Sequence, residues 1–211
     1  SRDLTEAEQV EKHNKGLHLK RHMVALDSIA VIVSPTNTLE EITLKQLRQV
    51  FSGQIENWSD LVANKNEPID VLMREKNSGT GRYFSEHVLN RQLTPDDALD
   101  KEEFCQESRV MTSNEAMISA VSASDRAIGF VGLNFALSAS GKVKLLKVKL
   151  LDTSVAVMPT MKNVADDYPL SRPLYLFADV DPKPTVKKFV DFCTADQGQK
   201  IARDHGYVTI K

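Results

Sequence analysis

Residues 70–82 read DVLMREKNSGTGR, and this stretch indicates how the chain around it folds. Its apolar first half ends at Arg74, and a polar turn follows the arginine. In residues 83–89, Phe84 and Val88 have the spacing of one helix face. The stretch therefore predicts a strand, a turn and the N-terminus of a helix.

The same turn has the chemistry of an oxyanion site. The first backbone N–H groups of a helix lack internal partners, and the helix dipole adds about half a positive charge at that end. Gly79 leaves room for a ligand to approach the backbone, Ser78 and Thr80 add hydroxyl groups, and Arg74 adds a guanidinium. We expect these four residues to bind an oxyanion. The alternative is an ordinary serine N-cap beside an unrelated arginine.

The composition is typical of a soluble, globular protein. The chain has 211 residues, of which 41% are hydrophobic and 27% charged, enough for one substantial core or two small ones. A formal net charge of −2 and dispersed lysines predict no nucleic-acid partner. No apolar run is long enough to span a membrane. Because Ser1-Arg2-Asp3 is not a signal peptide, we expect that an export leader was removed.

No metal and no cofactor are expected. The cysteines and histidines lack metal-ligand spacing, and His18 and His22 lie in a segment with a strand-like pattern. Cys105 and Cys193 are far apart in the sequence and in regions expected to lie in different parts of the fold. This separation favours two free thiols over a disulfide.

Helices and strands alternate along the chain, which favours an α/β fold. No internal repeat and no Pro/Gly/Ser-rich linker divides it. Expected helices cover residues 6–15, 44–51, a segment from 80, a short acidic segment from 95, 115–121, 184–193 and 196–205. Expected strands cover residues 22–33, 69–73, 127–132, 143–148, 174–177 and 207–210.

The order of several motifs resembles the PstS-like phosphate-binding proteins of bacterial phosphate ABC transporters. The motifs are Ser1-Arg2 with Leu4, Glu6 and Glu8; ALDSIAVIV at 25–33; LxxLxxVFSGxIxNW at 44–58, where x is any residue; RxxxSGT at 74–80; AIGFVG at 127–132; YPLSRPL at 168–174; and Gly198-Gln199 followed by GYV at 206–208. Each motif alone is weak, but the series runs through the whole chain in the family's order.

This resemblance implies a type II periplasmic-binding-protein fold with two α/β lobes and a ligand cleft. One lobe is expected to combine residues 1–34 and 133–211, and the other to contain residues 35–132. The implied function is extracytoplasmic or periplasmic binding of phosphate, or a related oxyanion, for delivery to an ABC transporter permease. The implied site adds Ser1 and Arg2, from the first lobe, to the turn at 74–80.

Two departures from the family pattern bear on this function. The family's usual N-terminal strand, loop and helix are missing before Ser1, so an N-terminally truncated lobe is expected, with either self-association through its exposed edge or weakened binding. The second departure is Lys76, because family members often have an acidic residue there that accepts the proton of hydrogen phosphate. Glu75 is a neighbouring candidate for that role, and only a weak preference for phosphate over sulfate is expected.

Other polar residues have structural alternatives to ligand binding. Asp27 lies in an apolar strand, where it needs either a charged partner or a position facing the ligand. Ser113 and Asn114 are expected to cap a helix and are further candidates for ligand contact. Trp58 is expected to pack beneath a loop.

Two other functional classes compete with transport. A degenerate domain of this family could serve adhesion, sensing or assembly. A serine-dependent hydrolase is the second alternative, but Asn77-Ser78-Gly79 lacks the first glycine of a nucleophile elbow. The protein is therefore not expected to be an enzyme.

Overall fold

The computed structural model describes residue 4 and residues 6–75, 77–94 and 102–210. Two compact units are present: residues 1–28 with 171–211, here called unit 1, and residues 29–170, here called unit 2. The long strand β1 (Leu19–Val33) contributes to both. It pairs with β8 (Ser171–Asp179) as far as Ser28, and with β5 (Ala127–Gly132) from Ile29 onward.

Unit 2 contains a mixed sheet with the strand order β4-β3-β5-β1-β6. Strands β3 (Asp70–Arg74) and β4 (Arg109–Met111) are parallel to each other, and β3 is also parallel to β5. Strand β1 is antiparallel to both β5 and β6 (Lys144–Leu145). A separate parallel pair joins β2 (Glu41–Thr43) to β7 (Lys147–Lys149). The parallel strands place their carboxyl ends at one edge of the sheet.

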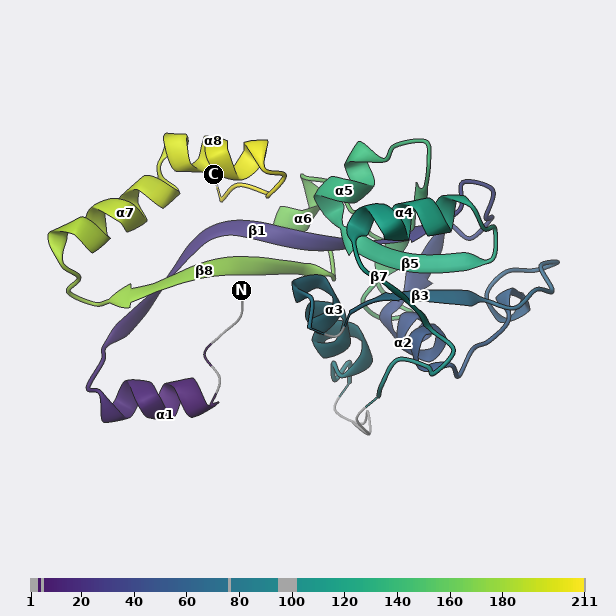
Figure 1. The fold of residues 1–211 in the computed structure, drawn as a ribbon, viewed down its shortest axis with the longest axis horizontal. Coiled ribbons are helices and arrows are strands. Elements are labelled where there is room, and N and C mark those ends of the chain that lie inside the picture. The colour runs from purple at the N-terminus through teal and green to yellow at the C-terminus, as the bar shows by residue number, and fades with distance from the viewer. Residues whose placement is uncertain (1–3, 5, 76, 95–101, 211) are drawn as a thin grey trace. The chain divides into compact units, whose positions relative to one another are not determined.

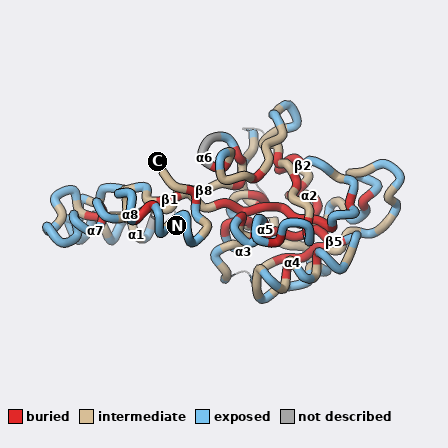
Figure 2. Tube along the Cα trace, turned by 90° about the horizontal axis from the view of Figure 1, so that it is seen from above, coloured by how far each residue is buried: buried red, intermediate tan, exposed pale blue. Residues whose placement is uncertain are grey.

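Helices cover both faces of this sheet (Figure 1). The helix α4 (Asn114–Ser122) packs on β5 so closely that a Cβ at Gly129 would lie 2.5 Å from the sulfur of Met117. On the other face, Phe130 of β5 stacks on Phe84, with ring centroids 3.9 Å apart, and contacts Phe51. Phe51 lies in α2 (Leu44–Ser52), and Phe84 ends α3 (Gly79–Phe84), which continues as a π-helical turn at Ser85–Leu89. These layers form a buried core, shown in red in Figure 2.

Local signals explain where the unit 2 helices begin and end. Thr43 and Gln46 form a capping box at the start of α2, and Gly53 adopts a left-handed conformation (φ 84°) at its end. Trp58, which begins the short 3₁₀-helix η1 (Trp58–Asp60), is fully buried and donates its indole N–H to the carbonyl of Arg126 at 2.9 Å. The remaining helices of unit 2 are α5 (Leu133–Ser138) and α6 (Asn163–Asp166).

Unit 1 is built around the two-stranded ribbon of β1 and β8. The helix α1 (Glu6–Asn14) lies on one face of the ribbon, and α7 (Pro184–Thr194) and α8 (Asp196–Asp204) lie on the other (Figure 1). A Cβ at Gly198 would lie 2.2 Å from the carbonyl oxygen of Phe192, so only glycine permits the close packing of α8 on α7.

Unit 1 buries few apolar side chains. Among its described residues, the buried hydrophobic ones are Ala25, Ala178, Val190 and Val208. Several large apolar side chains are exposed instead, among them Val180 at 63% and Phe189 at 57%. A two-stranded ribbon with so small a core contributes little stability by itself.

The structure confirms most of the expected elements and corrects two. The expected strand at 143–148 is divided into β6 and β7, which belong to different sheets, because Leu146 donates to the carbonyl of Val31 while Lys147 donates to that of Glu40. The expected strand at 207–210 is reduced to a single bridge between Leu26 and Val208. The expected helix from 95 falls outside the described residues.

The boundaries of the two units differ from the lobe boundaries predicted after residues 34 and 132. Residues 133–170 belong to unit 2, because β6 pairs with β1, β7 pairs with β2, and Tyr168 donates its hydroxyl to the carbonyl of Ile29 at 3.0 Å. The lobe division itself stays a prediction. Cys105 lies in unit 2 and Cys193 in unit 1, and both are free thiols, as expected.

Candidate functional site

Two helix N-termini lie at the carboxyl edge of the unit 2 sheet. Strands β3 and β4 are parallel, and their last residues, Arg74 and Met111, are register partners. Ser78, four residues after the end of β3, is the N-cap of α3, and Ser113, two residues after the end of β4, is the N-cap of α4. This arrangement brings the positive ends of two helix dipoles to one edge, where a ligand of an open α/β sheet usually binds.

The connection between β3 and α3 is shaped by Ser78 and Gly81. The Ser78 hydroxyl oxygen accepts the backbone N–H of Gly81 at 3.0 Å, and the N–H of Ser78 bonds to the carbonyl of Glu75 at 2.9 Å. A hydroxyl that accepts a bond still has its own O–H to donate. Ser78 can therefore cap α3 and bind an anion at the same time.

The two glycines of this turn have different surroundings. Apart from its chain neighbours and its own helix backbone, a Cβ at Gly79 would meet no atom of the described residues within 4 Å, so this exposed position is open to a ligand. A Cβ at Gly81 would lie 2.4 Å from the carbonyl oxygen of Glu75 and 2.9 Å from the Ser78 hydroxyl. Gly81 is thus the glycine that the turn itself requires.

The guanidinium of Arg74 bonds to the connection between β4 and α4. Its Nε donates to the carbonyl of Met111 at 3.2 Å, and its two terminal nitrogens donate to the carbonyl of Thr112 at 3.3 Å and to Oδ1 of Asn114 at 2.9 Å. A guanidinium has five N–H donors. Two donors of Arg74 therefore have no partner among the residues the structure describes, and they can bind an anion.

The first turn of α4 contributes further polar groups. Ser113 caps α4 by accepting the N–H of Ala116 at 3.0 Å. Asn114 uses its oxygen to accept from Arg74, so its NH2 group is the part of the amide able to donate to an anion. Hydrogen bonds from its own backbone N–H and from Ser113, with the charge of Arg74, lower the pKa of the exposed Glu115.

Two buried tyrosines of unit 2 are Tyr83, in α3, and Tyr168. Tyr83 in α3 is buried and stacks on the ring of His87, with centroids 4.1 Å apart. Burial, together with the neighbouring phenol of Tyr83, raises the pKa of Tyr168. Tyr168 therefore stays neutral and keeps its hydrogen bond to the Ile29 carbonyl.

The structure brings together most of the predicted site residues. Arg74, Ser78 and Gly79 lie at the same sheet edge as Ser113 and Asn114, and Thr80 follows in the first turn of α3. Ser1, Arg2 and Lys76 lie outside the described residues.

Asp27 has a structural partner. Its Oδ2 accepts two hydrogen bonds from Arg172, at 2.6 and 3.1 Å, and its Oδ1 accepts the N–H of Ser28 at 2.8 Å. This pairing within unit 1 explains a carboxylate in an apolar strand without a ligand. Direct contact of Asp27 with a ligand stays an untested prediction.

Two features of the site are not predicted from the sequence. The requirement for Gly81 was signalled only by a second glycine after Ser78-Gly79-Thr80. The bonds from Arg74 to the β4–α4 connection had no signal, because β4 has three residues and its partner is distant in sequence.

Comparison with known sequences identifies relatives of the whole chain. A family model described as a PBP superfamily domain matches residues 1–197. The phosphate-binding protein PstS of Staphylococcus epidermidis is 28% identical over 214 residues, which cover 99% of this chain and 62% of that protein. The chain therefore spans less than two thirds of the length of this relative, and the PstS of Staphylococcus aureus gives the same result, at 61%.

Solved structures share the fold. An ABC-type phosphate transport receptor from Vibrio cholerae has a TM-score of 0.80 and 26% identity, covering 99% of this chain and 78% of that one. A Clostridium perfringens protein, assigned as a phosphate ABC transporter substrate-binding protein and solved with bound phosphate, has a TM-score of 0.70 and 29% identity, covering 100% of this chain and 77% of that one. The predicted α/β fold class and the resemblance to PstS-like proteins are confirmed.

The comparisons also bear on the class of function. These relatives are binding proteins or receptors and not enzymes, in agreement with the predicted absence of catalysis. In the part of the chain that the structure describes, no helix is both long and apolar enough to cross a membrane. No group of three or more metal-ligating side chains occurs among those residues either.

Proposed function

Because the chain belongs to the PBP superfamily and is PstS-like, we propose that it binds phosphate, or a related oxyanion, at the carboxyl edge of β3 and β4. Its role is to collect the anion outside the cytoplasm and deliver it to the permease of an ABC transporter. The observation that carries the proposal is the meeting of the Arg74 guanidinium with the N-termini of α3 and α4.

Each group in this region suits a tetrahedral anion. Arg74 supplies N–H donors with a full charge, Ser78 and Thr80 supply hydroxyl groups, and Gly79 exposes the start of α3. The anion is further stabilised by two helix dipoles. The bound phosphate in the Clostridium perfringens relative, at 29% identity, supports this choice of ligand. Ser1 and Arg2 are part of the proposed site through the family resemblance.

We expect the site to discriminate only weakly between phosphate and sulfate. Glu75 is exposed, and the position two residues after Arg74 is occupied by a lysine. Without a carboxylate to accept the proton of hydrogen phosphate, affinities for phosphate and sulfate should differ by no more than about tenfold. A thousandfold preference for phosphate would show that a carboxylate accepts this proton.

Calorimetry and thermal unfolding with two variants of Ser78 test the site. Asparagine and aspartate both cap helices well, so Ser78→Asn and Ser78→Asp should keep the start of α3 intact. The aspartate places a negative charge at the proposed site and should abolish phosphate binding, whereas the asparagine should retain most of it. Equal phosphate affinity in the two variants would remove this turn as the site.

Thermal unfolding of the wild-type protein with and without phosphate distinguishes a transport binding protein from the alternative, a domain used for adhesion, sensing or assembly. Phosphate at about 100 times its dissociation constant should stabilise a binding protein by about 2.7 kcal/mol. A chain that phosphate, sulfate and arsenate all fail to stabilise would favour the alternative.

A further inference from the structure

Glu115 places a carboxylate beside the proposed anion site. It is the second residue of α4 and directly follows Asn114, whose side-chain oxygen accepts a hydrogen bond from Arg74 at 2.9 Å. The carboxylate bonds to the N–H of its own residue and to the hydroxyl of Ser113. These bonds and the charge of Arg74 lower the pKa of Glu115, so the group is ionised at neutral pH. A negative charge therefore lies at the end of α4 where phosphate is proposed to bind.

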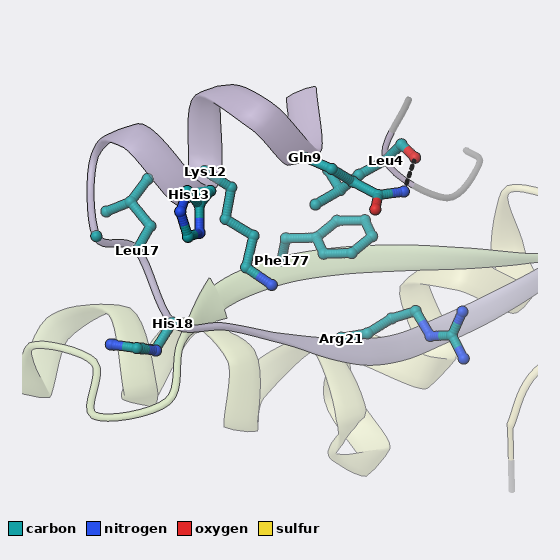
Figure 3. Close-up of a pocket in the computed structure, with 9 residues that line it drawn as sticks. Leu4, Gln9, Lys12, His13, Leu17, His18, Arg21 and Phe177 are labelled. Atoms are coloured by element: carbon teal, nitrogen blue, oxygen red, sulfur yellow. Dashed lines mark hydrogen bonds between the residues drawn. The ribbon is translucent and has the colours of Figure 1, made fainter. Parts of the chain in front are cut away.

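A carboxylate at this place needs an explanation, because sites for anions usually gather positive charge. Elsewhere in the chain, basic side chains do gather without an acid. The cavity of unit 1 between α1 and the ribbon of β1 and β8 is lined by Lys12, His13 and His18 (Figure 3). No carboxylate is found among the described residues that line it. At the start of α4, by contrast, an acid and a base occur together.

The charge of Glu115 is balanced by the same groups that would balance a bound anion. Among the residues that the structure describes, no salt bridge includes Glu115. Its compensating charges are the positive end of the α4 dipole and, at longer range, Arg74. An oxyanion that binds at this edge of the sheet has to share both with the carboxylate.

The side chain of Glu115 also has room to leave this position. It is exposed, and it lines a cavity of about 720 Å³ between α4 and α5. Asn134 at the start of α5 and Lys142 beyond its end line the same cavity. These residues carry amide and ammonium N–H groups that can donate to a carboxylate. An arriving anion can thus displace the carboxylate toward a polar surface.

We propose that Glu115 is a built-in competitor of the bound anion: its carboxylate occupies the start of α4 while the site is empty and lowers the affinity for every oxyanion. This inference rests on the proposed function. Its consequence is faster release of the anion, because affinity differences at one site appear mainly in the dissociation rate. A carboxylate with a lowered pKa and two hydrogen bonds is a poor acceptor for the proton of hydrogen phosphate, so phosphate and sulfate should be affected alike.

Calorimetry of Glu115→Gln with phosphate and with sulfate tests the proposal. Glutamine keeps the length of the side chain and removes its charge. Both affinities should rise about three- to fivefold at low ionic strength, the scale of an interaction between exposed charges, and the gain should shrink in 1 M salt. Without an anion, the variant should unfold at a slightly lower temperature than the wild type, because a carboxylate stabilises a helix N-terminus. A merely structural role of Glu115 would instead give weaker binding.

Two control variants separate this local charge from other effects. Glu115→Asp keeps the negative charge at the start of α4, so both affinities should stay within twofold of the wild type. Glu56→Gln removes an exposed carboxylate at the opposite edge of the same sheet, where the carbonyl of Glu56 accepts the N–H of Ile69 just before β3. It should also leave both affinities within twofold.

Three outcomes would overturn the proposal. One is unchanged or weaker binding of both anions by Glu115→Gln, and another is an equal gain in Glu56→Gln, which would indicate an effect of net charge alone. The third is tighter sulfate binding with weaker phosphate binding, which would make Glu115 the acceptor of the phosphate proton. Absence of anion binding in the wild type and in every variant would refute the proposed function together with this inference, so the two failures are distinguishable.

Discussion

The two glycines at the start of α3 allow ligand binding to be separated from stability. Gly79→Ala adds a methyl group that meets no other part of the described structure within 4 Å, apart from its chain neighbours and its own helix, and Gly81→Ala adds one 2.4 Å from the Glu75 carbonyl oxygen. The first substitution therefore changes only the space open to a ligand. The second forces the turn between β3 and α3 to move.

The expected magnitudes follow from these distances. To admit the methyl group at Gly81, the Glu75 carbonyl must move by about 1 Å, which breaks its bond to the N–H of Ser78. Overpacking costs about 1–3 kcal/mol and a lost hydrogen bond about 1 kcal/mol, against a gain of about 1 kcal/mol in helix propensity. Gly81→Ala should thus lower the free energy of unfolding by about 2 kcal/mol. Gly79→Ala should leave it unchanged or raise it by up to about 1 kcal/mol.

Gly79→Ala, which should not lower stability, should instead lower the affinity for phosphate. A methyl group at Gly79 blocks close approach to the first N–H groups of α3, so phosphate affinity should fall at least about tenfold, or 1.4 kcal/mol. Thermal unfolding and phosphate titration of both variants measure the two effects. A Gly79→Ala protein that binds phosphate like the wild type would refute ligand approach at α3, and equal destabilisation by both variants would refute the assigned role of Gly81.

Four further substitutions test the site in unit 2 and two features of unit 1. Arg74→Ala should cost about 2–4 kcal/mol of phosphate affinity and also some stability, because its bonds to the β4–α4 connection are lost; calorimetry showing unchanged affinity would exclude it as a ligand. Asn114→Ala should destabilise by about 1–2 kcal/mol, measured by urea unfolding, and no loss would mean that Arg74 does not depend on it. Asp27→Asn should lower stability by about 1 kcal/mol while phosphate affinity stays within twofold, since its carboxylate pairs with an arginine; a large affinity loss would make it a ligand residue. Sedimentation velocity should show self-association of the wild type that Phe189→Lys reduces, whereas a monomeric wild type would contradict the predicted association.

Local signals explain why much of the site could be predicted. The Ser78 cap, the glycine after it and the apolar residues of the following helix all lie within one short stretch. The Ser113 cap of α4 was predicted for the same reason. A cap depends on hydrogen bonds between residues three apart, so both partners lie within one short stretch of the sequence.

Features that depend on distant residues could not be predicted in this way. The strand β4 is three residues long and mostly exposed, so it has neither apolar periodicity nor length to signal it. The expected strand at 143–148 was divided because its two halves pair with different strands, which periodicity alone does not reveal. Tertiary pairing decides both cases.

Arg74 has two roles, one as an anion ligand and one in holding together parts of the chain that are distant in sequence. The sequence predicts its guanidinium only as a ligand group, whereas in the structure three of its N–H groups bond to Met111, Thr112 and Asn114. Those bonds restrict the side chain's rotation before any anion arrives, so little side-chain entropy remains to be lost on binding. They also connect the turn before α3 to the start of α4. Loss of Asn114 should therefore weaken anion binding through the orientation of Arg74, even where the amide itself makes no contact with the ligand.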